Sequence, residues 1–117
     1  MIKIEAIIRP EKVNQVSAAL SDVGCGGFHY QNVTGQGRQQ GVEVFTGRGG
    51  QTATRAAMPK TIITTVVRDD LKDAVITAIL KAAKTGDEGT IGDGKIFVSN
   101  ISDAVRVRTE ESGEDVL

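Results

Sequence analysis

The chain has 117 residues, which is enough for one domain with a hydrophobic core. Hydrophobic residues make up 39% of the chain and aromatic residues only 3%, so the core must consist of Ile, Val, Leu and Ala. A formal net charge of −1 gives no electrostatic basis for binding nucleic acid, and the aromatic side chains on which single strands stack are scarce. We therefore expect no nucleic-acid partner.

A single cysteine, Cys25, excludes a disulfide within the chain and is typical of a reducing compartment. The N-terminal segment carries charges inside its apolar run, unlike a signal peptide, and no apolar stretch reaches membrane-spanning length, so the sequence predicts a cytoplasmic protein. The only histidine, His29, is nearby, which raises the alternative of a Cys–His nucleophile. A small thiol packed in a turn is the simpler interpretation, and one Cys and one His cannot complete a tetrahedral metal site.

The first part of the chain alternates between strand and helix patterns. Residues 2–8 have the period of a strand, and residues 10–23 place Val and Leu at helical spacing behind a proline suited to the first helical position. Residues 28–34 return to the composition of a strand. Gly35-Gln36-Gly37 should break or bend it, and residues 42–45 resume an extended pattern.

A long loop separates the two halves of the pattern. Residues 46–60 are small and polar, and loops of this length in compact domains usually have a function. A β-branched strand follows over residues 61–67. The aspartates at 69–70 stand where a helix N-cap and first turn would profit from negative charge, and one apolar helical face runs over residues 71–82.

The remaining segments complete a recognisable order of elements. Residues 96–101 predict another strand, residues 104–109 a last extended segment, and residues 110–117 an acidic, mobile tail. The order β-α-β, long loop, β-α-β predicts an α+β fold, a ferredoxin-like βαββαβ sandwich with a four-stranded antiparallel sheet and two helices on one face. Apolar residues such as Ile7 and Ile63 are expected on the uncovered face, which hints at self-association.

One glycine-rich segment is suited to binding phosphate. Residues 89–95 (GTIGDGK) fit the first seven positions of the pattern G-x-x-x-x-G-K-[ST], but Ile96 stands where a hydroxyl would hold magnesium. A nucleotide-hydrolase loop lies between a strand and a helix, whereas this one follows a helix and leads into a strand. The order excludes a hydrolase loop. It leaves a plain turn or an anion-binding nest of backbone amides with Lys95.

Two further segments are suited to phosphate. GQGRQQG at residues 35–41 misses the dinucleotide fingerprint by one position. In VRVRT at residues 105–109, Arg106 and Arg108 would point the same way on an extended segment and favour a polyphosphate between them, with a solvated strand face as the alternative. No general base, nucleophile or carboxylate pair accompanies the three segments, so we expect a nucleotide-binding domain without catalytic residues.

These same segments carry a family resemblance. The stretches that resemble the PII signal-transduction proteins, trimeric sensors of nitrogen and carbon, are KIEAIIRPEKV (3–13), GQGRQQG (35–41), PK (59–60), IGDGKIFV (91–98) and VRVRT (105–109). They cover nearly the whole chain in the right order. The resemblance implies one PII-like domain over residues 1–117, assembled as a homotrimer, with a T-loop at about 37–58, a nucleotide loop at 85–95 and a C-terminal tail at 110–117.

The resemblance also implies a site for ATP or ADP, with Mg²⁺ as an optional companion, in the clefts between subunits. Residues 92–95 would wrap the phosphates, the arginines of VRVRT would reach in from the neighbouring subunit, and Thr64 stands where the family usually has a glutamate near the base. The nucleotide-binding residues that the resemblance implies are Ile7, Gly27, Phe28, His29, Gly35, Gln36, Gly37, Arg38, Gln39, Thr64, Gly92, Asp93, Gly94, Lys95, Arg106 and Arg108.

An effector anion would bind beside the nucleotide, at Gly37, Gln39 and Lys60, with Gln39 also contacting Mg²⁺. The anion implied is 2-oxoglutarate or, as in some carboxysome-associated relatives, bicarbonate. The T-loop would dock onto a target transporter or enzyme, and a transporter would recruit the protein to a membrane. The implied function is thus a sensor of energy and of a carbon or nitrogen metabolite. A regulator of nitrogenase or an ammonium channel, a slow ATPase and a purely structural trimer are alternatives.

Besides Thr64, the sequence departs from the family pattern at several other places. The only tyrosine, Tyr30, lies outside the T-loop, so uridylylation of a T-loop tyrosine is not expected. The nucleotide loop reads TGDEGTIGDGK where the common form is T-G-K-I-G-D-G-K, an insertion that adds Asp87 and Glu88. Glu110 replaces a glycine after the second arginine of VRVRT. The partner and the preference among ATP, ADP and AMP are therefore open at this stage.

Overall fold

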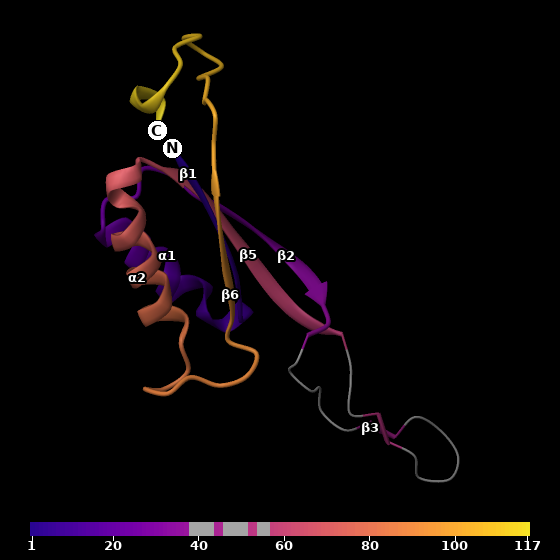
Figure 1. The fold of residues 1–117 in the computed structure, drawn as a ribbon. Helices are drawn as coiled ribbons and strands as arrows, with labels where there is room; N and C mark the ends of the chain where they lie inside the picture. The colour runs from indigo at the N-terminus through magenta and orange to yellow at the C-terminus, as the bar shows by residue number, and fades with distance from the viewer. Residues whose placement is uncertain (38–43, 46–51, 54–56) are drawn as a thin grey trace.

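The computed structural model describes residues 1–37, 44–45, 52–53 and 57–117, and Figure 1 shows their arrangement. Strands and helices alternate in the order that the sequence predicts. The elements are β1 (Ile2–Ile8), the 3-10 turn η1 (Pro10–Lys12), α1 (Val13–Asp22), β2 (His29–Gly35), β3 (Val44–Phe45), β4 (Thr52–Ala53), β5 (Met58–Val67), η2 (Asp69–Leu71), α2 (Lys72–Ala83), β6 (Gly94–Asn100) and η3 (Glu114–Val116).

The main sheet has four antiparallel strands in the order β2-β5-β1-β6. Both helices pack on one face of it, and β2 and β5 form a long hairpin that extends past the helices (Figure 1). This arrangement confirms the predicted ferredoxin-like βαββαβ sandwich. β1 pairs with both β5 and β6. Because Ile8 at the end of β1 pairs with Gly94, the loop before β6 lies next to that end of β1.

The core lies between the sheet and the helices. Burial alternates strictly along β1 and along most of β5, as the two-residue period of a strand requires. Burial of each Ile or Leu side chain stabilises the fold by roughly 1.5–3 kcal/mol. The buried hydrophobic residues are Ile2, Ile4, Ala6, Ile8, Val16, Leu20, Ile63, Val67, Val75, Ile79 and Ala83.

The prediction for the uncovered face was half right. Ile7 is only partly buried and lies on that face, but Ile63 is 1% exposed and belongs to the core. Ile62 is the residue that stands opposite Ile7. The sequence pattern misleads here because β5 is β-branched at nearly every position, and the buried face itself contains Thr61 and Thr65. Hydrophobicity alone therefore does not reveal which set of alternate residues faces the helices.

Two boundary predictions were also wrong. Residues 58–60, predicted to end a loop, form the start of β5, and a short pair of strands, β3 and β4, lies in the segment between β2 and β5. Asp69 and Asp70 lie in the first turn of η2, as predicted, but Asp69 is not its cap, because Arg68 occupies the N-cap position and no side chain caps that turn. The Asp69 carboxylate lies 2.9 Å from the N-terminal ammonium group instead.

The C-terminal segment folds back instead of extending. Val105 makes an isolated bridge to Ser112 around a turn at residues 107–109, so the predicted extended segment at 104–109 is wrong. The tail ends in η3, and the backbone of Leu117 lies close to Gly26. The tail thus contains local structure that its acidic composition did not predict. None of the described helices is long and apolar enough to cross a membrane.

Candidate functional site

A cavity of about 540 Å³ lies on the uncovered face of the sheet, where the end of β2 meets the loop before β6. It joins segments that are far apart in sequence, and two of them are the glycine-rich segments that predict phosphate binding. Lys60 and Lys95 supply positive charge to the cavity, and Ile7 and Phe97 supply apolar surface. Its lining is Ile7, Val33, Thr34, Gly35, Gln36, Gly37, Met58, Lys60, Ile91, Gly92, Gly94, Lys95 and Phe97.

The register of the sheet brings further predicted residues close to this cavity. Gln31, Ile62, Ile7 and Lys95 form one row across the four strands, because paired residues in antiparallel strands point to the same face. The next row, two residues along each strand, contains His29 and Thr64. Both predicted residues therefore share the uncovered face with the cavity, although neither lines it.

The remaining predicted residues lie elsewhere. Phe28 packs against the core, and Gly27 accepts a hydrogen bond from Thr65 through its carbonyl oxygen. The C-terminal segment lies at the end of the sheet opposite the loop before β6 (Figure 1), and within that segment Arg106 pairs with Glu111 at 3.4 Å. Its neighbour Arg108 stands in the turn, so the two guanidinium groups do not share an extended strand. Arg38 and Gln39 lie outside the described residues.

The nucleotide loop ends at Gly94, the first residue of β6, where the sheet leaves no room for a side chain. Gly94 has φ +116°, a conformation that L side chains rarely adopt, and it pairs with Ile8 of β1. A Cβ at Gly94 would overlap the carbonyl oxygen of Ile7. The absence of a side chain thus lets the nucleotide loop lie directly against β1, next to the cavity.

The carboxylate of Asp93 organises the loop. Its Oδ1 accepts hydrogen bonds from Arg9 Nε at 2.9 Å and from the Thr85 hydroxyl at 2.6 Å. Its Oδ2 accepts from the backbone N–H groups of Thr85 at 2.9 Å and Thr90 at 2.8 Å. Burial alone would raise the pKa of Asp93, but the hydrogen bonds from Thr85, Thr90 and Arg9 outweigh it and hold the pKa well below its usual range. Four donors thus hold the side chain within the loop.

This carboxylate should make stability depend on pH. Because the pKa of Asp93 is lower in the folded than in the unfolded state, its contribution is present above about pH 4 and is lost as the pH falls below that value. We expect Asp93→Asn to flatten the decline of the unfolding free energy between pH 5 and pH 3, measured by urea denaturation. Asp87→Asn is the control, since it changes a charge in the same loop without these hydrogen bonds. Parallel curves for the wild type and Asp93→Asn would contradict the assignment.

Lys60 links β5 to the same loop. Its Nζ donates a hydrogen bond to the carbonyl oxygen of Gly92 at 2.5 Å. Burial and the nearby charge of Arg9 lower the pKa of Lys60, against the opposing effects of Glu11 and Asp93. The ammonium group therefore stands between the cavity wall and the glycine loop, where an anion would meet it.

The sequence patterns did not reveal Arg9, Thr85 and Thr90 as partners of Asp93. The register of the sheet contains a signal for Arg9. In the antiparallel pairing of β1 with β6, Ile8 stands opposite Gly94, so the next residues outward, Arg9 and Asp93, must also face each other. An opposite charge at both positions would have suggested an ion pair, once the pairing of these two strands was assumed.

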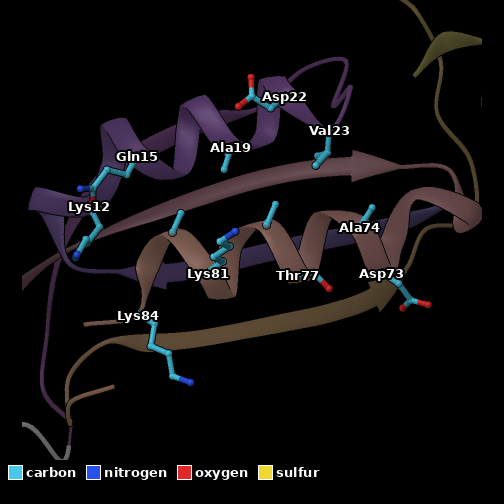
Figure 2. A pocket seen from close by; sticks show the side chains of 12 residues that line it. Lys12, Gln15, Ala19, Asp22, Val23, Asp73, Ala74, Thr77, Lys81 and Lys84 are labelled. Atoms are coloured by element: carbon cyan, nitrogen blue, oxygen red, sulfur yellow. The ribbon is translucent and has the colours of Figure 1, made fainter. Parts of the chain in front are cut away.

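Two further hollows lie in the described part of the chain, and the second shares Ile91, Gly94, Lys95 and Phe97 with the cavity. One, of about 880 Å³, runs between α1 and α2 (Figure 2), and its lining includes Ala19, Ala74, Ala78 and Ala82. Lys12 and Lys81 line it near one end, and Asp22 and Asp73 near the other (Figure 2). The other hollow, of about 890 Å³, lies between α2, the nucleotide loop and β6. The hollow between the helices contains no residue that the sequence predicts for binding.

The single cysteine has a packing role. Its Sγ lies 3.1 Å from the hydroxyl oxygen of Thr65, and Cys25 packs against the core. This placement agrees with a small thiol packed in a turn. Within the described residues there is no group of three or more His, Cys, Asp or Glu side chains that could hold a metal ion.

Comparison with known proteins identifies the family. Residues 1–111 match the family described as Nitrogen regulatory protein P-II. A protein named Nitrogen regulatory protein P-II 2 from Methanothermobacter thermautotrophicus is 47% identical, and the match covers 100% of this chain and 97% of that protein. A Nitrogen regulatory protein P-II from Bradyrhizobium diazoefficiens is 48% identical, with 100% of both chains covered, and one from Mesorhizobium japonicum is 46% identical with the same coverage.

The chain belongs to the PII family. This confirms the resemblance that five sequence segments carry. PII proteins are regulatory signalling proteins, and the family in general binds adenine nucleotides, forms trimers and interacts with target enzymes and transporters. Membership therefore establishes a general role in signalling for this PII chain, and it agrees with a protein that is not an enzyme.

Proposed function

We propose that this PII chain binds ATP or ADP in the cavity between β2, β5 and the loop before β6. The observation that carries the proposal is the meeting of two phosphate-suited segments, residues 35–37 and 91–95, around one cavity. Lys95 supplies a cation there, and the glycines at 92 and 94 leave backbone groups exposed to a ligand. Mg²⁺ would accompany ATP through phosphate oxygens and Gln39, and it would neutralise phosphate charge when bound.

We further propose that the site is completed in a homotrimer. Arg106 and Arg108 would come from the neighbouring subunit, because neither lines the cavity of its own chain. Gly27, Phe28 and His29 would lie near the adenine or the ribose. Support comes from unpaired surface on the main sheet. Among the described residues β6 is an edge strand whose one partner is β1, and Phe97 on it is 54% exposed. The partly buried pair Ile7 and Ile62 adds apolar surface on the uncovered face.

The effector is proposed to be a small carboxylate-like anion that binds at Gly37, Gln39 and Lys60. Lys60 supports this assignment, because its ammonium group lines the cavity and also holds the carbonyl oxygen of Gly92. An anion that attracts this ammonium group would act on the nucleotide loop as well. We propose 2-oxoglutarate as the effector, with bicarbonate as the alternative.

The output is proposed to pass through the T-loop to a target transporter or enzyme. The protein would act in the cytoplasm and would be recruited to a membrane when the target is a transporter. With 2-oxoglutarate as effector, the target would be an ammonium channel or nitrogenase. With bicarbonate as effector, the protein would regulate carbon uptake as a carboxysome-associated regulator. Titration of both anions in the presence of ATP separates the two, because only the true effector should change the ATP affinity.

Calorimetry with ATP and ADP tests nucleotide binding. We expect both to bind the wild type, and Lys95→Ala to weaken ATP binding by about tenfold or more, the scale of one charge-assisted contact. Lys72→Ala is the matched control, since Lys72 begins α2 and does not line the cavity. No binding at millimolar nucleotide would refute the proposal. Release of phosphate that disappears in Lys95→Ala would instead favour a slow ATPase.

A further inference from the structure

Arg9 contacts the nucleotide loop but does not line the cavity. Its side chain is 17% exposed, and its planar guanidinium group donates hydrogen bonds to two different acceptors. Nε donates to Asp93 Oδ1 at 2.9 Å, and Nη2 donates to the carbonyl oxygen of Ile91 at 3.0 Å. One side chain from the end of β1 therefore holds two points of a loop that is 82 to 84 residues away in sequence.

These contacts fix the direction of a backbone amide. The peptide group between Ile91 and Gly92 is planar and trans, so its N–H points opposite to its carbonyl group. Because Arg9 holds the Ile91 carbonyl, the N–H of Gly92 must point away from Arg9. In the part of the chain that the structure describes, this N–H donates to no carbonyl or side chain. Gly92 itself lines the cavity.

We propose that Arg9 is a positioning residue for phosphate binding, which directs the Gly92 amide through its hydrogen bonds to Ile91 and Asp93. This inference rests on the proposed nucleotide function but adds a residue that has no contact with the cavity. Arg9 would not touch the nucleotide. Its loss would leave the loop free to turn the Ile91–Gly92 peptide group, and a phosphate would then meet a carbonyl oxygen in place of a donor.

The charges around Arg9 explain why the arrangement is specific. Asp93 supplies the carboxylate, and Lys60 holds the adjacent carbonyl of Gly92 from the other side. Lys84 packs against Gly89 beside the same carboxylate, and Glu11 acts on Lys60 from η1. The other cations lack the two-pronged geometry of a guanidinium group, so neither lysine can replace Arg9 at both acceptors.

The test compares Arg9→Gln and Arg9→Lys with Arg68→Gln, a control arginine that pairs with Glu114 at 3.4 Å far from the cavity. NMR without nucleotide would follow the Gly92 amide and the titration of Asp93. Titrations with ATP and with adenosine, which lacks phosphates, would follow binding. We expect Arg9→Gln to shift the Gly92 amide, raise the pKa of Asp93 and weaken ATP about tenfold or more, with adenosine unchanged within about twofold.

The outcomes separate positioning from mere stability. Arg9→Lys should retain part of the ATP affinity, because it keeps the charge but loses one of the two contacts, and it also serves if Arg9→Gln fails to fold. Equal losses for ATP and adenosine, or an unchanged ATP affinity, would overturn the inference. If the wild type bound no nucleotide, the proposed function would fail. The NMR shift of the Gly92 amide in the two Arg9 variants would then still test whether Arg9 positions this amide. An unchanged NMR signal of the Gly92 amide in both Arg9→Gln and Arg9→Lys would overturn the positioning role of Arg9.

Discussion

Gly94→Ala is expected to cost about 4 kcal/mol or more of the free energy of unfolding and to abolish nucleotide binding. A Cβ at this position would overlap the carbonyl oxygen of Ile7, so β1 and β6 would have to separate. The positive φ of Gly94 adds backbone strain. Separation of these strands would move Lys95, whose strand partner is Ile7, away from the cavity. Urea denaturation and calorimetry with ATP measure the two effects.

Gly86→Ala provides a matched control for this substitution. Gly86 also has positive φ, at +62°, but a Cβ there would meet nothing within 4 Å. We expect only the cost of the left-handed conformation, about 1–2 kcal/mol, with nucleotide affinity largely retained. Equal costs for the two glycines would mean that the approach of Gly94 to β1 contributes nothing beyond backbone strain.

Asp93→Ala is expected to destabilise the fold by about 3 kcal/mol and to disorder the nucleotide loop. The substitution leaves the guanidinium group of Arg9 without its carboxylate and removes the acceptor for Thr85 and Thr90. Urea denaturation measures the loss of stability, and amide exchange over residues 85–93 measures the loss of order. Asp87→Ala, in the same loop, should change the unfolding free energy by less than about 0.5 kcal/mol. A similar effect of both substitutions would contradict the organising role of Asp93.

Most of the fold was predictable from local patterns. The spacing of Val and Leu on the helices, the alternation in β1 and the order of elements led to the ferredoxin-like sandwich that the structure has. The VRVRT segment failed because alternation describes a strand only where a partner strand exists. Val105 instead finds Ser112 across its own turn, and Glu110 takes a positive φ of 59° to close it. The sequence of VRVRT alone does not show whether a partner strand lies beside it.

The sequence predicted which segments form the candidate site but not the hydrogen bonds that join them. Glycine patterns and the family resemblance marked residues 35–37 and 92–95, and the structure brings both to one cavity. The phosphate contact of Asp93 stays a prediction, and the sequence did not reveal that its side chain holds the loop together through Arg9, Thr85 and Thr90. Such contacts depend on the register of β1 against β6. A single sequence does not state that register.

The position of ATP in a crystal structure of its complex tests the central claim most directly. We expect the phosphates to lie in the cavity between β2, β5 and the loop before β6, within hydrogen-bonding distance of the Gly92 amide and of Lys95 Nζ. Arg106 and Arg108 of a neighbouring subunit should reach the same phosphates. ATP bound in the hollow between α1 and α2, or with its phosphates away from residues 92–95, would contradict the proposed nucleotide site.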